Sequence, residues 1–272
     1  MNDAPDFAAV TAKQQATWSE GDFSKVGAHI TYVAERLAEA LEIMPSDRVL
    51  DVACGSGNGA IAAARRSWVP VVGADFVPAL LARGRERAAA EGLEIEFVEG
   101  DAQSLPFADA EFEATMSIFG AMFAPDQERT AAELLRVTKP GGRIAMANWV
   151  PDSGVGEMFA TIVKHTGGPP AGLVPPVLWG TEDRLRELFG DGIAELRTER
   201  LGTRMTFRSA DHYIDFFRTY FGPIKTAFEA VGPAGEAAFS NDLRAFLEAR
   251  NSAGEGALVM EPEYLQVVAT RA

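Results

Sequence analysis

The stretch that decides the fold is Val49-Leu50-Asp51-Val52-Ala53-Cys54-Gly55-Ser56-Gly57-Asn58-Gly59, in which a short apolar run leads into closely spaced glycines. Because the apolar run follows a Pro-Ser-Asp turn, it predicts a buried β-strand. The alanine-rich residues from Ala60 to Arg66 predict a helix directly behind the glycines. A glycine turn between strand and helix lets a ligand approach the backbone, and the free N–H groups of the helix favour an anionic group.

The strand, turn and helix pattern repeats toward the C-terminus. Such alternation predicts a parallel sheet with helices on both faces, which is an α/β fold. The strands are expected at Val69–Ala74, Ile95–Glu99, Glu111–Ile118 and Arg143–Trp149, and the helices at Pro78–Glu91 and Gln127–Val137, with a turn at Lys139–Gly142.

The flanking sequence is less regular, and we expect one domain over residues 1–272. Its parts are an N-terminal helical segment at 1–44, a core at 45–150, and two insertions at 151–180 and 202–257, the second rich in aromatic residues. Periodicity and turn residues predict helices at Lys25–Glu42, Gly156–Thr166, Thr181–Phe189, Ser209–Tyr220, Pro223–Val231 and Gly235–Arg250, and strands at Ile193–Leu201 and Leu258–Thr270. Pro262 confines the last strand to an irregular or edge position.

Acidic residues stand where three of the predicted strands end. Asp51 precedes Gly55, Asp75 follows the second strand, and Asp101 follows the third. Ligands of open parallel sheets bind outside the carboxyl ends of the strands, so these acids are expected to converge on one cleft. Asp75 is placed to accept hydrogen bonds from both hydroxyls of a ribose, and Phe76 to pack on a purine.

The glycine turn alone leaves two kinds of cofactor open. The spacing Gly55-x-Gly57-x-x-Ala60 also fits a loose dinucleotide fingerprint, so an NAD(P)-dependent oxidoreductase is one alternative. A non-catalytic cofactor-binding protein of the same fold is another.

Taken together, these motifs resemble the class I S-adenosylmethionine-dependent methyltransferases, in particular the small-molecule group of the ubiquinone and menaquinone biosynthesis methyltransferases. The resemblance extends over about residues 41–150. It rests on Val49–Gly57, Gly73-Ala74-Asp75, Gly100-Asp101-Ala102, Leu105-Pro106-Phe107, Leu134-Leu135-Arg136-Val137 and Lys139-Pro140-Gly141-Gly142. It implies methyl transfer from S-adenosylmethionine to an O, N or C atom of a small molecule, leaving S-adenosylhomocysteine.

The resemblance also implies a topology and a cofactor site. The sheet would be Rossmann-like, doubly wound and seven-stranded, with the last strand antiparallel between the fifth and sixth. In this sequence the connection at 202–257 is too long for the hairpin turn of that topology, and we interpret it as a helical cap inserted near the C-terminus. In the glycine turn, which includes Ala53 and Ser56, Gly55 and Gly57 would line the methionine moiety, and Asp51 would orient the loop and the amino group. Asp75 would bind the ribose, Asp101 and the backbone of Ala102 the adenine, and the carbonyl of Ser117 the amine.

Residues on the acceptor side are harder to identify, because an in-line methyl displacement needs alignment and dehydration more than a general base. His29 is a candidate base on the first predicted helix. Cys54 is expected to be an apolar filler, and the scattered histidines predict no metal site. Candidates for an apolar acceptor pocket are Trp18, Tyr32, Phe119, Met122 and Trp149.

Bulk composition limits the partners. The net charge of −14 opposes binding to nucleic acid, which leaves a small-molecule substrate as the expected partner. Residues 1–20 contain no apolar run that would serve as a signal peptide, and no stretch approaches the roughly 20 apolar residues needed to span a bilayer. With a single cysteine as well, we expect a cytoplasmic protein without membrane insertion, either a monomer or a homodimer.

Overall fold

The computed structural model describes residues 5–254 and 256–272. Residues 1–4, at the start of the expected segment 1–44, and Glu255, in the expected insertion 202–257, lie outside the described residues. Within the described residues, we find no helix with the length and apolar character needed to cross a membrane.

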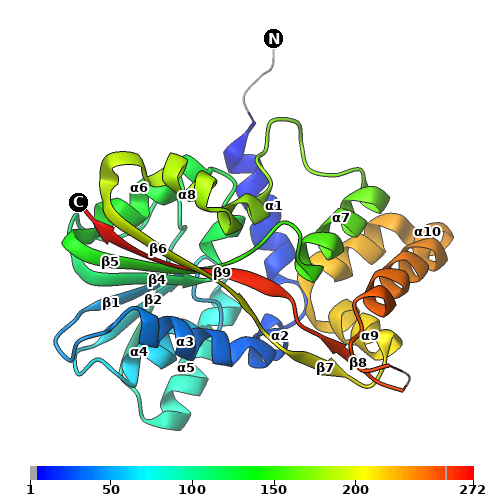
Figure 1. Ribbon diagram of the computed structural model, residues 1–272, viewed down its shortest axis with the longest axis horizontal. Helices are drawn as coiled ribbons and strands as arrows, with labels where there is room; N and C mark the ends of the chain where they lie inside the picture. The colour runs from blue at the N-terminus through cyan, green and yellow to red at the C-terminus, as the bar shows by residue number, and fades with distance from the viewer. Residues whose placement is uncertain (1–4, 255) are drawn as a thin grey trace.

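The centre of the structure is a seven-stranded sheet (Figure 1). Its strands are β1 (Val49–Val52), β2 (Val71–Asp75), β3 (Ile95–Glu99), β4 (Phe112–Ile118), β5 (Thr138–Trp149), β6 (Ile193–Gly202) and β9 (Glu263–Arg271). They lie in the order β3-β2-β1-β4-β5-β9-β6, with β1 to β5 parallel and β9 antiparallel to both of its neighbours. The predicted doubly wound α/β fold with an antiparallel last strand is therefore confirmed.

Helices cover both faces of this sheet (Figure 1). On one face lie α3 (Thr31–Ala40), α4 (Asn58–Ala64) and α5 (Pro78–Glu91), and on the other α6 (Gln127–Val137) and α8 (Glu182–Phe189). Helix α3 shows why the sequence folds this way, because Val33, Ala34 and Leu37 are almost fully buried while Tyr32 on its other side is 65% exposed. One apolar stripe thus packs on the sheet and the polar side meets water.

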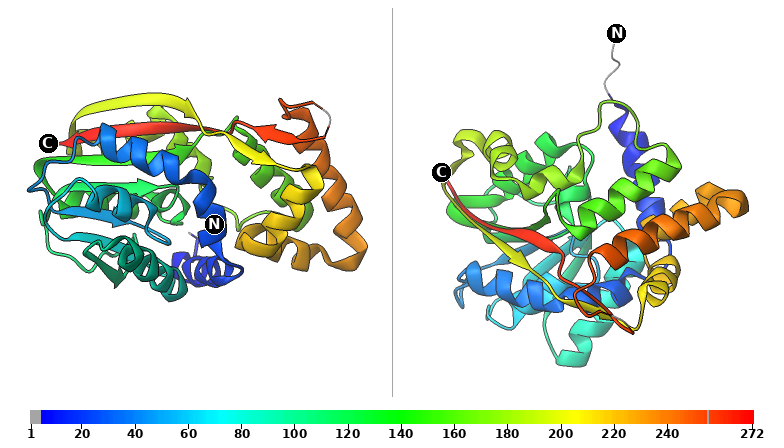
Figure 2. Two further views of the ribbon diagram at one scale, coloured as in Figure 1. Left: turned by 90° about the horizontal axis from the view of Figure 1, so that it is seen from below. Right: turned by 45° about the vertical axis from the view of Figure 1, so that its right-hand side comes forward.

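A second layer of elements extends beyond the carboxyl ends of the parallel strands (Figure 2). Beyond β6 and β9 the same two segments pair again as β7 (Met205–Phe207) and β8 (Leu258–Met260). Between β7 and β8 in the sequence lie α9 (Ala210–Tyr220) and α10 (Gly222–Ala249). Helices α1 (Phe7–Ser19) and α7 (Gly154–Thr166) both contact α10. We name α7, α9, α10, β7 and β8 the cap.

The structure corrects several predicted boundaries. The helix expected over 25–42 is divided into α2 (Phe23–Gly27), a 3-10 turn η1 (Ala28–Ile30) and α3. Strand β5 includes the turn expected at 139–142, and α10 joins two predicted helices across Gly232, whose φ of 61° marks a kink. Pro262 lies in the irregular break between β8 and β9, and β9 is not an edge strand. The remaining 3-10 turns are η2 (Ala121–Phe123), η3 (Pro176–Gly180) and η4 (Gly190–Gly192).

Replacing Leu37 with alanine tests whether the buried stripe of α3 holds the helix on the sheet. Leu37 is fully buried, so Leu37→Ala is expected to lower the free energy of unfolding by about 2–5 kcal/mol. Tyr32→Ala, on the exposed side of the same helix, should change it by less than about 1 kcal/mol. Urea unfolding of both variants measures this; equal losses would contradict the assigned helix face.

Candidate active site

The glycine turn joins β1 to α4 through a backbone that mostly glycine can adopt. Gly55 and Gly57 have φ angles of 55° and 82°, and Ala53 holds a strained φ of 53°. Gly59 has no room for a side chain, because a Cβ there would lie 2.5 Å from the Ile118 side chain and 2.7 Å from Asp51 Oδ2. The start of α4 is therefore pressed against the ends of β1 and β4.

Asp51 lies directly beneath this turn and is 1% exposed. Its Oδ2 accepts a hydrogen bond from the Ala60 N–H at 2.7 Å, whereas Oδ1 is buried with no partner among the described residues. Burial raises the pKa of Asp51 to about 7; the Ala60 N–H lowers it, and nearby Asp75 raises it further. A buried carboxylate oxygen without a partner is costly unless a ligand supplies a donor or a positive charge.

Asp75 is also buried, but both of its oxygens hold backbone groups. Oδ2 accepts from the Gly55 N–H and Oδ1 from the Val77 N–H, each at 2.8 Å. Burial raises the pKa of Asp75 to about 6, against the opposing effect of these hydrogen bonds. Each oxygen has a second lone pair, so Asp75 can fix the glycine turn and still accept from a ligand hydroxyl.

The third acid connects the site to the N-terminal helix. Asp101 accepts from the Gln103 backbone N–H at 2.9 Å, and its two oxygens lie 3.1 and 3.0 Å from Gln103 Nε2. The same Nε2 lies 2.9 Å from Thr11 Oγ1 on α1. Gln15 on α1 donates to the carbonyl of Phe76, so α1 is attached at both sides of the adenine end of the expected site.

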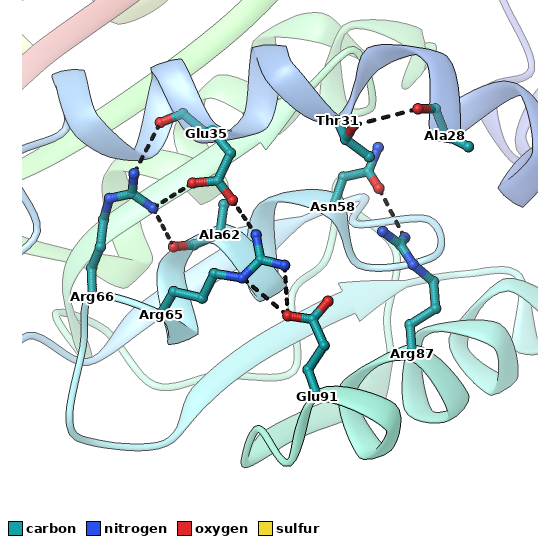
Figure 3. A network of polar contacts seen from close by, with 9 residues as sticks. All are labelled: Ala28, Thr31, Glu35, Asn58, Ala62, Arg65, Arg66, Arg87 and Glu91. Carbon is teal, nitrogen blue, oxygen red and sulfur yellow. Dashed lines mark hydrogen bonds and ion pairs between the residues drawn. The ribbon is translucent and has the colours of Figure 1, made fainter.

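The polar network of Figure 3 supports the glycine turn from behind. Arg87 on α5 donates to Asn58 Oδ1 at 2.8 Å, as Figure 3 shows. Arg87 also donates to the Ser56 carbonyl at 2.6 Å, and Asn58 Nδ2 donates to the Gly27 carbonyl at 2.9 Å. Arg65 bonds both Glu35 and Glu91 and so joins α4 to α3 and α5. These contacts hold the glycine turn and the start of α4 against α2, α3 and α5.

The glycine turn and the three acids line a cavity with an empty volume of about 890 Å³. Eight of the predicted cofactor residues line it: Asp51, Ala53, Gly55, Ser56, Asp75, Phe76, Asp101 and Ala102. Gly57 and Ser117 do not. The side chain of Ser117 is structural, because its Oγ donates to the Val52 carbonyl and accepts from the Ala121 N–H. Sequence reasoning missed Thr11, Gln14, Phe23 and Gln103, which also line this cavity.

A second cavity of about 600 Å³ adjoins the first on the side of the cap. Of the predicted acceptor residues, Trp18, Phe119 and Trp149 line it. Tyr32 is exposed and Met122 is fully buried, and neither lines either cavity. The cap and neighbouring segments contribute residues that the sequence did not indicate, including Met158, Phe159, Met205, Tyr213, Phe217, Phe221 and Met260.

The candidate base His29 lies outside both cavities. It is exposed and stacks on Phe207 of β7 with ring centroids 5.5 Å apart. Its place in the helix predicted over 25–42 could not show this, because the chain breaks into η1 at that point. Within the described part of the chain, no group of three His, Cys, Asp or Glu residues could hold a metal ion.

The hydrogen-bond acceptors that line the first cavity fit S-adenosylmethionine. The unpartnered Oδ1 of Asp51 suits a cationic amino group, and Asp75 and Asp101 are acceptors for hydroxyl and amino hydrogens. Gly55 leaves room for a ligand against the backbone, because a Cβ there would meet only Phe23, at 3.8 Å and beyond.

Asp51→Asn is expected to change how stability depends on pH. The folded-state pKa of about 7 exceeds the ordinary value of 3.8, so the stabilising effect of protonating Asp51 is complete below about pH 4 and is lost as the pH rises through 7. From pH 5 to pH 8 the native chain should therefore lose on the order of 2 kcal/mol relative to Asp51→Asn.

Urea unfolding across this range measures the difference. Asp183→Asn, at an exposed position in the first turn of α8, is the control for the same change of side chain outside the core. A pH-independent difference between Asp51→Asn and the native chain would contradict the raised pKa of Asp51.

Comparison with known proteins agrees with this geometry. Residues 49–142 match the family model described as a methyltransferase domain. An uncharacterized protein of Mycobacterium tuberculosis is 37% identical over 96% of this chain and 95% of its own. A demethylmenaquinone methyltransferase of Deinococcus radiodurans is 44% identical over 47% of this chain and 54% of its own.

The fold has solved counterparts as well. The YcgJ protein of Bacillus subtilis superposes with a TM-score of 0.62 at 18% identity, covering 88% of this chain and 98% of that one. The glycine turn, Asp51, Asp75 and Asp101 all lie within the matched range, and the solved structure shares the fold. The chain belongs to the class I S-adenosylmethionine-dependent methyltransferases and is an enzyme that uses S-adenosylmethionine as its cofactor.

Proposed function

We propose that the protein transfers the methyl group of S-adenosylmethionine to a largely apolar small molecule that binds in the second cavity. The observation that carries this proposal is the composition of that cavity. It is lined by aromatic and aliphatic side chains and by Met158, Met205 and Met260, and among the described residues no Asp, Glu, His, Lys or Arg lines it. Flexible methionines and rigid rings suit an apolar ligand.

The same composition argues against a strongly charged acceptor. A localised charge buried in this cavity would lose its water without gaining a partner, which is costly. Among the described residues, the one hydroxyl that lines it is that of Tyr213, which donates to Met158 Sδ at 3.5 Å. Burial raises the pKa of Tyr213, so its hydroxyl stays protonated and does not serve as a base. The acceptor must therefore supply its own nucleophile and release any proton to water.

The first cavity would hold the cofactor, whose sulfonium supplies an electrophilic methyl group. We assign the amino group to Asp51, the ribose to Asp75 with Phe76 beside it, and the adenine to Asp101 and Ala102. Two cofactor candidates, Gly57 and Ser117, do not line the cavity, so we propose that they shape the site without contacting the cofactor. A demethylmenaquinone methyltransferase among the relatives supports an acceptor of apolar character.

We also propose that the protein works in the cytoplasm without a nucleic-acid partner. Its one cysteine, Cys54, is buried and free, which suits a reducing compartment. The net charge of −14 would repel a phosphate backbone.

Asp75→Ala is expected to weaken the binding of S-adenosylhomocysteine at least tenfold. The variant loses hydrogen bonds to the ribose, worth about 1.5–3 kcal/mol each, together with the bond that fixes Gly55. Titration calorimetry measures the affinity. Asp109→Ala, whose side chain is 80% exposed, is the control and should bind as the native chain does. Native affinity in Asp75→Ala would remove Asp75 from the site.

A panel of paired acceptors tests the acceptor class. With labelled S-adenosylmethionine, an apolar phenol or quinol should be methylated, and its carboxylate or amine derivative should not be. Val155→Asp places a charge in the second cavity at the first turn of α7, where a helix tolerates a carboxylate. This variant should lose most turnover of the apolar acceptor while binding S-adenosylhomocysteine within about twofold of the native affinity.

Val163→Asp is the matched control, because Val163 lies on the same helix and is 44% exposed. It should retain turnover. Preferred methylation of the charged acceptors would contradict the proposal, and cofactor binding without transfer to any member of the panel would favour a non-catalytic protein.

A further inference from the structure

The two cavities meet at a narrow set of residues. The side chains that line both are Trp18, Phe23, Ile30, Phe119 and Phe123. Four of the five are aromatic, and we name Trp18, Phe23, Phe119 and Phe123 the aromatic collar. They come from α1, α2, the end of β4 and η2, so segments distant in sequence supply the aromatic side chains that the two cavities share.

The rings of the collar are held in fixed orientations. Trp18 meets Phe23 edge to face, with centroids 5.5 Å apart at 88°, and meets Phe123 at 5.2 Å and 58°. Phe119 stacks on Trp149 with centroids 3.7 Å apart and planes within 4°. The backbone of Phe119 holds a φ of 54°, which is strained for an aromatic residue. Such strain persists only where the surroundings enforce it, often at a functional site.

The two cavities differ in their charged side chains, and this difference indicates a role for the collar. Asp51, Asp75 and Asp101 all line the first cavity, and among the described residues no charged side chain lines the second. A cation at the passage between the two cavities therefore finds no carboxylate on the acceptor side with which to pair. Aromatic faces attract cations through their ring electrons, most strongly where water is excluded.

We propose that the aromatic collar is a cation–π site for the sulfonium group of S-adenosylmethionine. This proposal rests on the proposed function, because the methyl group must face the acceptor through the passage that the collar surrounds. On transfer the acceptor forms a bond to the methyl carbon, and the sulfur keeps the electron pair of the broken C–S bond. The resulting thioether is neutral, so the collar favours the methyl donor over its product.

The affinity ratio of S-adenosylmethionine to S-adenosylhomocysteine tests this proposal without any acceptor. Calorimetry with both ligands should show that Phe123→Leu weakens binding of the sulfonium roughly three- to thirtyfold more than binding of the thioether. Phe123→Tyr keeps the ring and should restore the native ratio. Ile30→Val, which lines both cavities without a ring, should leave the ratio unchanged.

Equal weakening of both ligands by Phe123→Leu would overturn the proposal, because the ring would then serve only as packing. If Phe123→Leu does not unfold cooperatively, Phe23→Leu takes its place. The same greater loss of affinity for the sulfonium than for the thioether is expected of it. Failure of both ligands to bind the native chain would instead contradict the assignment of the first cavity. The collar and the cofactor site are thus tested separately.

Discussion

The buried hydrogen bond from the Ala60 N–H to Asp51 is the interaction on which the rest of the site depends. It fixes the first turn of α4 against the end of β1, and a side chain at Gly59 would break this contact. Asp75 holds the other side of the same turn through the Gly55 N–H. Two desolvated carboxylates therefore shape the glycine turn before any ligand binds, and their cost is offset by backbone donors and, for Asp51, by a ligand cation.

Local sequence signals were sufficient for the core of the molecule. Strand β1, the glycine turn and α4 were predicted because apolar run, glycines and alanines stand next to each other in the chain. Asp75 and Asp101 could be placed at the cavity because the ends of parallel strands meet at one edge of a sheet. Even here the sequence did not show that the oxygens of Asp75 are engaged by backbone N–H groups.

The acceptor side could not be predicted to the same extent, since it depends on contacts between distant segments. Helix α1 has no fully buried residue and no apolar stripe, yet Trp18 lines both cavities. His29 and Tyr32 looked suitable by type, but the break at η1 and the phase of α3 turn both outward. Strands β7 and β8 are short and pair across more than fifty residues of sequence, which no local pattern reveals.

The two cavities divide the chemistry by polarity. Charges and hydrogen bonds in the first cavity recognise a polar cofactor, and their effect is strengthened by burial. Among the described residues no Asp, Glu, His, Lys or Arg lines the second cavity, so it offers no countercharge to a charge that develops during transfer. On transfer the sulfonium becomes a neutral thioether, and the positive charge passes with the methyl group to the acceptor, which loses it by releasing a proton. An apolar cavity suits an acceptor that is neutral both before and after this exchange, because neither state leaves a buried charge without a partner.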